Sequence, residues 1–334
     1  MSVYKLLALL SLVSYSSTGQ YTETINSNRP GFSYGAYSVG TNVVQGEVGG
    51  RYGNDNHDLL NTDTDVYNVD YSLRYGLFYE RLEVILDGTY ANETLREPGD
   101  LLTNEFNNNF IKHGSYYELI KILPDGTYSN EIVKVPTNSI ISEVTSSNFR
   151  RNTIGAKYII YDRYFQKEKE GPNVISWKAD NTFQWDDFIP SVSAYAGANI
   201  LLGESPFMFE GEPSLSPRVG IITQNNYKNW VFVTNFIADK FTTDFPRYEG
   251  IFTLTHTISQ DFAVFGEYQF IINDLYSDDL FRFGLGFLAL KDLQLDTSVM
   301  VNTRDTPSRW YAGFGISYRY DDAHKENKIY EDKK

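Results

Sequence analysis

The sequence predicts an all-β protein, a transmembrane, antiparallel, up-and-down β-barrel of about 12 strands with a long extracellular hairpin insert at residues 93–148. Three observations predict this fold. Apolar and polar residues alternate, which is the period of strands whose side chains point to opposite faces. Aromatic residues gather near strand ends, as in the girdles of membrane barrels. Short and longer polar connections also alternate along the chain, as in outer-membrane barrels.

The alternation is clearest over residues 280–320, which contain three expected strands. In the last strand of this stretch one face is apolar and aromatic: Trp310, Ala312, Phe314, Ile316, Tyr318 and Tyr320. The other expected strands lie near residues 43–52, 67–75, 82–87, 154–160, 191–202, 216–223, 229–238, 250–258 and 262–272. A soluble sandwich with its apolar faces turned inward would show the same alternation. The aromatic ends and the alternating loop lengths favour the membrane barrel.

The chain divides into four parts. Residues 1–19 have the basic start, short apolar core and small-residue exit of a cleaved signal peptide. Residues 20–40 contain the chain breakers Pro30 and Gly31 and are expected to form a periplasmic lead-in segment or partial plug. Arg29, Pro30 and Gly31 are placed at or inside the periplasmic mouth. Residues 41–320 form the barrel, with a polar loop at 54–64, and residues 321–334 form a charged periplasmic tail.

Composition excludes several classes of protein. The net charge of −14 argues against a nucleic-acid partner, because phosphates would be repelled. The absence of Cys excludes zinc fingers and thiol catalysis. After the N-terminus no apolar run reaches the roughly 20 residues of a spanning helix. The expected location is therefore the outer membrane of a Gram-negative bacterium, with lipid around the strands.

Catalysis and metal binding are not expected. The four His residues, His57, His113, His256 and His324, have no neighbouring Ser in a catalytic pattern. The acidic stretch 54–65 lacks the Gly and the closing Glu of a calcium loop. The sequence predicts no cofactor and no metal.

The polar face of the strands carries the candidate functional residues. A charge on the lipid face near the midplane costs roughly 2–4 kcal/mol for Arg or Lys, so the charged face must look inward. Twelve residues are expected to line the lumen: Glu47, Arg51, Asp70, Arg74, Glu83, Asp87, Lys157, Arg218, Glu267, Arg282, Asp296 and Arg319. They either pair across strands and fill the barrel, or line a polar pathway whose mixed charges select the solute.

The sequence also resembles the outer-membrane transporter family named after the phenol-degradation meta-pathway, from about Ser27 to Tyr320 with residues 93–148 unmatched. Six motifs carry the resemblance: Asn28-Arg29-Pro30-Gly31-Phe32, Leu73-Arg74-Tyr75-Gly76-Leu77, Gly155-Ala156-Lys157-Tyr158, Pro217-Arg218-Val219, Asp292-Leu293-Gln294-Leu295-Asp296 and Gly313-Phe314-Gly315-Ile316-Ser317-Tyr318-Arg319. The resemblance implies transport of small, hydrophobic or aromatic compounds.

The expected function is an outer-membrane channel or transporter that passes small molecules through a polar lumen. The alternative is a non-conducting structural or docking barrel that binds a partner protein through residues 93–148 or the tail. The sequence names neither the solute nor a protein partner.

Overall fold

The computed structural model describes residues 24–98, 110–113, 116–122, 128–134, 141–163, 185–201, 205–208, 211–274 and 276–324. The expected signal peptide at residues 1–19 lies outside these residues, as does the tail after His324.

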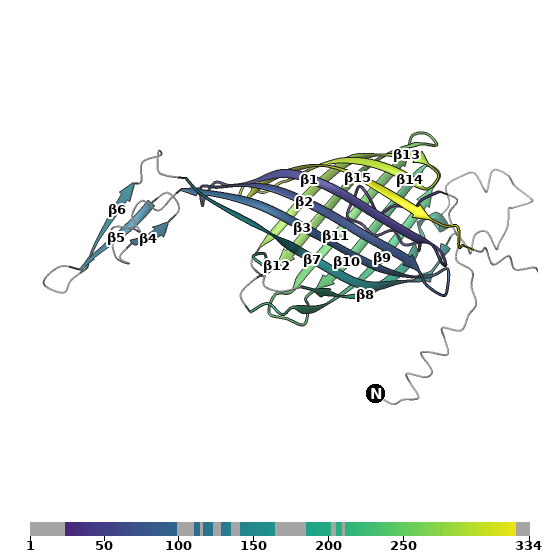
Figure 1. The fold of residues 1–334 in the computed structure, drawn as a ribbon, viewed down its shortest axis with the longest axis horizontal. Coiled ribbons are helices and arrows are strands. Elements are labelled where there is room, and N and C mark those ends of the chain that lie inside the picture. Colours follow the sequence, from purple (N-terminus) through teal and green to yellow (C-terminus); the bar gives the residue numbers. More distant parts are fainter. Residues whose placement is uncertain are drawn as a thin grey trace, which may run out of the picture.

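Twelve strands of the described chain close into an antiparallel barrel (Figure 1). Each pairs with the next along the chain, β3 pairs with β7 across the insert, and β1 pairs with β15 to close the barrel. The strands are β1 (Val44–His57), β2 (Thr62–Gly76), β3 (Leu82–Pro98), β7 (Ile141–Tyr161), β8 (Ser191–Ile200), β9 (Leu215–Tyr227), β10 (Trp230–Asp239), β11 (Arg247–Thr257), β12 (Phe262–Asn273), β13 (Ser277–Leu290), β14 (Leu293–Asn302) and β15 (Ser308–Tyr320). The expected up-and-down barrel of about 12 strands is confirmed.

The two faces of the barrel are the reverse of those in a soluble protein. Phe283 of β13 and Phe314 of β15 are 54% and 58% exposed on the outside. Arg74 and Lys157 point inward and are fully buried. A large apolar exterior around a charged interior is stable only against lipid, and a closed barrel leaves no strand edge unpaired there. The barrel is therefore a transmembrane one, and the soluble sandwich is excluded.

The two ends of the barrel differ in their connections. One end, called the short-turn end, carries turns such as Lys291-Asp292 between β13 and β14 and residues 228–229 between β9 and β10. The other, the long-loop end, carries residues 201–214 and the insert between β3 and β7. Figure 1 shows β1, β2, β3 and β7 reaching beyond the other strands at that end.

Two expected boundaries differ from the structure. The polar stretch 54–64 is mostly strand, because β1 continues to His57 and β2 begins at Thr62. Its charged side chains pair with those of neighbouring strands, for example Asp55 with Arg309. The strands can therefore continue there although apolar residues no longer alternate with polar ones. The insert also begins later than residue 93, since β3 continues to Pro98 and β7 begins at Ile141.

The insert contains a sheet of its own. The hairpin expected in it corresponds to β5 (Tyr116–Ile122) and β6 (Tyr128–Lys134), and β4 (Phe110–His113) adds a third strand that the sequence did not predict. Between β7 and β8 lies a short 3-10 helix, η1 (Trp185–Phe188). No helix among the described residues is long and apolar enough to cross a membrane.

Candidate functional site: the interior of the barrel

Residues 24–40, called the lead-in, run through the inside of the barrel. Near its start, Arg319 on β15 donates from Nη1 to the Thr24 carbonyl oxygen (3.0 Å). Further along, the Phe32 amide donates to Glu267 on β12 (3.0 Å to Oε2), and the Ala36 amide donates to Gln224 on β9 (2.9 Å). An irregular segment can be buried only if its backbone groups find partners, and here inward-facing side chains of the wall supply them.

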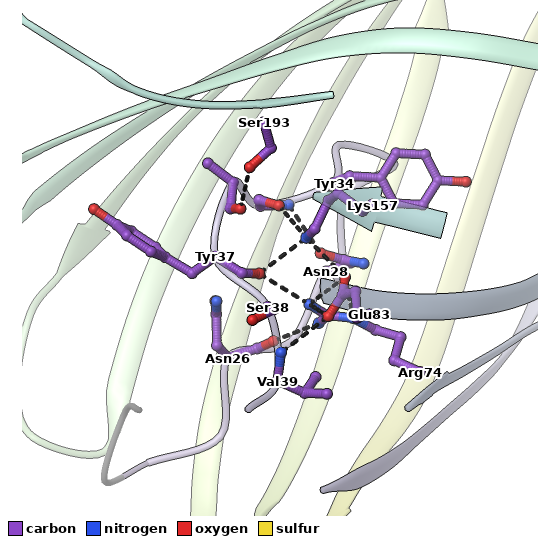
Figure 2. A network of polar contacts seen from close by, with 12 residues as sticks. Asn26, Asn28, Tyr34, Tyr37, Ser38, Val39, Arg74, Glu83, Lys157 and Ser193 are labelled. Atoms are coloured by element: carbon purple, nitrogen blue, oxygen red, sulfur yellow. Dashed lines mark hydrogen bonds and ion pairs between the residues drawn. The ribbon is translucent and has the colours of Figure 1, made fainter. Parts of the chain in front are cut away.

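Glu83 on β3 is the centre of one polar network that holds the lead-in (Figure 2). It pairs with Arg74 of β2 (3.0 Å) and with Lys157 of β7 (2.8 Å), and it accepts the Val39 amide (2.9 Å). Lys157 also donates to the carbonyl oxygens of Gly35 and Tyr37, and Arg74 donates to those of Asn26 and Tyr37. All three charged side chains are fully buried.

Glu83→Gln is expected to lower the free energy of unfolding by about 3–5 kcal/mol, because it leaves two buried cations without their shared carboxylate. Denaturant unfolding of the protein in micelles, followed by circular dichroism, measures the change. The control is Glu143→Gln, whose side chain is 61% exposed beside Arg96 and should contribute about 0–1 kcal/mol. Equal effects of the two substitutions would contradict a supporting role for Glu83.

Arg29 anchors the lead-in to another part of the wall, at β14. Its guanidinium donates from Nε and Nη2 to the two carboxylate oxygens of Asp296 on β14 (3.1 and 3.0 Å). The same guanidinium lies against Gly49 of β1 and Gly315 of β15, which are paired across the two strands. A Cβ at either glycine would overlap the guanidinium. We call this arrangement of Arg29, Asp296, Gly49 and Gly315 the arginine latch.

The aromatic residues of the lead-in lie among charged side chains. The Phe32 ring is covered by the guanidinium groups of Arg51 (4.8 Å) and Arg282 (4.1 Å). The Tyr34 ring stacks on Tyr195 of β8 at 5.6 Å, and its hydroxyl donates to Asp87. The middle of the lead-in is therefore anchored by ring contacts as well as by hydrogen bonds.

The lead-in does not fill the barrel. A cavity of about 280 Å³, which we call the outer chamber, lies between Phe32 and Tyr34 of the lead-in and residues such as Lys240 and Tyr276 near the long loops. A second cavity of about 70 Å³ lies beside Arg29 against β1, β2 and β3. Eight basic side chains line the outer chamber: Arg51, Arg150, Arg151, Arg218, Lys240, Arg247, Arg282 and Arg309. The carboxylates that line it are Asp239 and Glu249.

The structure places the twelve predicted residues on the inward face, in two overlapping groups. Eight hold the lead-in by hydrogen bonds to its residues: Glu47, Arg74, Glu83, Asp87, Lys157, Glu267, Asp296 and Arg319. Six line one or both cavities: Glu47, Arg51, Asp70, Asp87, Arg218 and Arg282. The pairing expected between neighbouring strands is also present, for example Arg51 with Asp70 and Arg282 with Glu267.

Sequence reasoning missed several charged residues of the outer chamber. Arg151 lies three residues before the expected start of its strand at Ile154, on the same face as Lys157. Asp239 and Arg247 lie just beyond the expected ends of β10 and β11. These strands extend toward the long-loop end beyond their last apolar residue. Extending each predicted strand by the same two-residue period would therefore have identified all three.

The sequence matches the family model described as "Putative MetA-pathway of phenol degradation" over residues 27–320. This range coincides with that of the resemblance seen in the motifs, which is confirmed. None of the curated proteins matches the sequence.

Several solved structures are similar in fold. The COG4313 outer membrane channel from Pseudomonas putida F1 is 8% identical, with 89% of this chain and 100% of that chain covered and a TM-score of 0.48. The NanC porin is 10% identical (82% and 98% covered, TM-score 0.43), and the translocator domain of the autotransporter NalP from Neisseria meningitidis is 7% identical (95% and 94%, TM-score 0.40). At such low identities and scores these likenesses say nothing about what this chain transports.

Proposed function

This chain belongs to the family described as "Putative MetA-pathway of phenol degradation", and we propose that it is a non-enzymatic channel of the Gram-negative outer membrane. The channel passes small molecules, and the lead-in gates it. The short-turn end would face the periplasm and the long-loop end the outside, as in bacterial barrels generally.

The observation that carries this proposal is a segment held inside the barrel with cavities on two of its sides. Near Arg29 it is held by polar contacts, such as the hydrogen bond from Gln294 to the Arg29 carbonyl oxygen. A neutral hydrogen bond contributes only about 0.5–1.5 kcal/mol net, because water replaces it when the segment moves. The Arg29 end is therefore suited to reversible displacement, whereas Tyr34 and Ala36 pack in a buried apolar cluster.

The two cavities indicate the route. Both are lined by Phe32, Tyr34, Arg51 and Arg151, so they adjoin at these residues. We propose that solute passes from the outer chamber along β1, β2 and β3 when the Arg29 end of the lead-in moves, while Tyr34 stays anchored on Tyr195.

Removal of residues 20–38 tests the gate. The shortened protein is expected to carry a larger single-channel current in planar bilayers than the full chain, because the barrel wall remains and the interior is emptied. Circular dichroism melting must show that the barrel is intact. Unchanged current in an intact barrel would refute the gate.

Liposome swelling with the full chain separates the channel from the alternative of a docking barrel, which would admit no solute. The cavities beside the lead-in favour the channel.

A further inference from the structure

The outer chamber has an uneven distribution of charge. Its lining contains the eight basic side chains named above but only two carboxylates, in a chain whose net charge is −14. Most of the acids that neutralise these cations are not in the lining: Asp70 pairs with Arg51, Glu267 with Arg282 and Asp278 with Arg309. More basic than acidic side chains therefore border the chamber itself, and this imbalance favours an anion there.

Two arginines of the chamber also have unused hydrogen-bond donors. Arg218 is 2% exposed, and its Nη1 pairs with Asp239 (3.0 Å), but its buried Nε has no partner. Arg151 pairs through Nη2 with Asp87 (3.5 Å), and its Nε is likewise buried without a partner. Both guanidinium groups belong to residues that line the same chamber. A guanidinium has donors only, so an acceptor that reached these two groups would find unpaired donors.

The opposite part of the chamber is apolar where the barrel alternation calls for polar residues. Leu280, Met300 and Tyr311 form a buried cluster with Val66, and Ile271 packs against it. All but Val66 line the chamber. An apolar wall facing a water-filled lumen is unfavourable by itself but contributes to binding when a solute covers it.

We infer that the outer chamber is a binding site for a small amphipathic organic anion, with its acidic group at Arg151 and Arg218 and its apolar body on the wall of Ile271, Leu280 and Met300. The volume of about 280 Å³ is far above the roughly 10–15 Å³ that one water needs, and approaches the about 300 Å³ of the smaller ligand pockets. A carboxylate suits this site because it bonds guanidinium groups in a bidentate, charge-assisted way. This inference rests on the proposed function and names the class of its solute.

The test compares three probes with the same ring: benzoate, benzyl alcohol and benzylamine. Isothermal titration calorimetry of the full chain in micelles is expected to show benzoate binding at least tenfold more tightly than benzyl alcohol, and benzylamine weakest. The variant Arg218→Gln/Asp239→Asn removes the cation together with its buried partner, so that no unpaired carboxylate remains. It should lower the affinity for benzoate at least tenfold and leave that for benzyl alcohol unchanged.

Arg151→Gln is a second variant from another strand and should also weaken benzoate binding. The matched control is Lys228→Gln, which removes one positive charge at an exposed short turn and should leave the affinity unchanged. Equal affinities for the three probes, a preference for benzylamine, undiminished binding by both chamber variants or no binding of benzoate would each overturn the inference. Binding in micelles does not require conduction, so a barrel that binds benzoate but fails in liposome swelling would refute the channel alone.

Discussion

Arg29→Ala is expected to raise the mean current through a single barrel severalfold in planar bilayers. In the arginine latch the guanidinium makes a bidentate bond to Asp296, whose side chain is fully buried. Removing one partner of a buried ion pair typically costs about 3–5 kcal/mol. If the substitution destabilises only the closed state, in which the lead-in blocks the route, a cost of about 3 kcal/mol lowers the ratio of closed to open barrels by about 100-fold.

A steric variant tests the latch without removing a charge. Gly49→Ala places a methyl group where the Arg29 guanidinium lies, so it should raise the current in the same direction. Arg304→Ala is the matched control, because Arg304 is an exposed residue that pairs with Asp279 outside the barrel interior, and its loss should not change the current. Wild-type current in both latch variants, with the barrel intact, would show that the latch does not gate.

Phe283→Arg is expected to destabilise the barrel in lipid vesicles by about 2–4 kcal/mol, the typical cost of an Arg on the lipid face near the midplane. Phe283 lies in the middle of β13 on the outward face, next to the inward-facing Arg282. Denaturant unfolding from vesicles measures the change.

Two controls accompany this substitution. Phe283→Leu keeps an apolar side chain and should cost less than about 1.5 kcal/mol. Leu59→Arg places the same charge at the exposed turn between β1 and β2, beyond the strand ends, where the change should stay within about 0.5 kcal/mol. If Phe283→Arg were as mild as Leu59→Arg, the outward face would not lie in lipid.

The strands were predictable because one face of each meets lipid and the other meets the polar interior of the barrel. At Arg282 and Phe283, for example, the alternation alone indicates which side chain looks inward, and the structure agrees. The signal weakens where the strands leave the membrane. There polar residues such as Asp55 continue β1, and Asp55 pairs with Arg309 of the neighbouring strand. No local pattern in the sequence indicates this pairing.

The lead-in was recognisable only as an irregular segment. Pro30 and Gly31 exclude regular structure, but they do not say where the segment lies. Its position depends on pairs that are far apart in the chain, such as Arg29 with Asp296, which are separated by 267 residues. The outer chamber could not be predicted from the sequence either, because Arg151, Arg218 and Met300 come together only when the barrel closes.

The sequence by itself determined the fold class, the inward or outward direction of the residues in the apolar belt and the family. These follow from local alternation between a residue that meets lipid and one that does not. Only the tertiary structure decided which of the inward charges hold the lead-in and which line cavities. That division depends on which strands face one another across the interior, and closure of the barrel sets it through contacts that no short stretch of sequence contains.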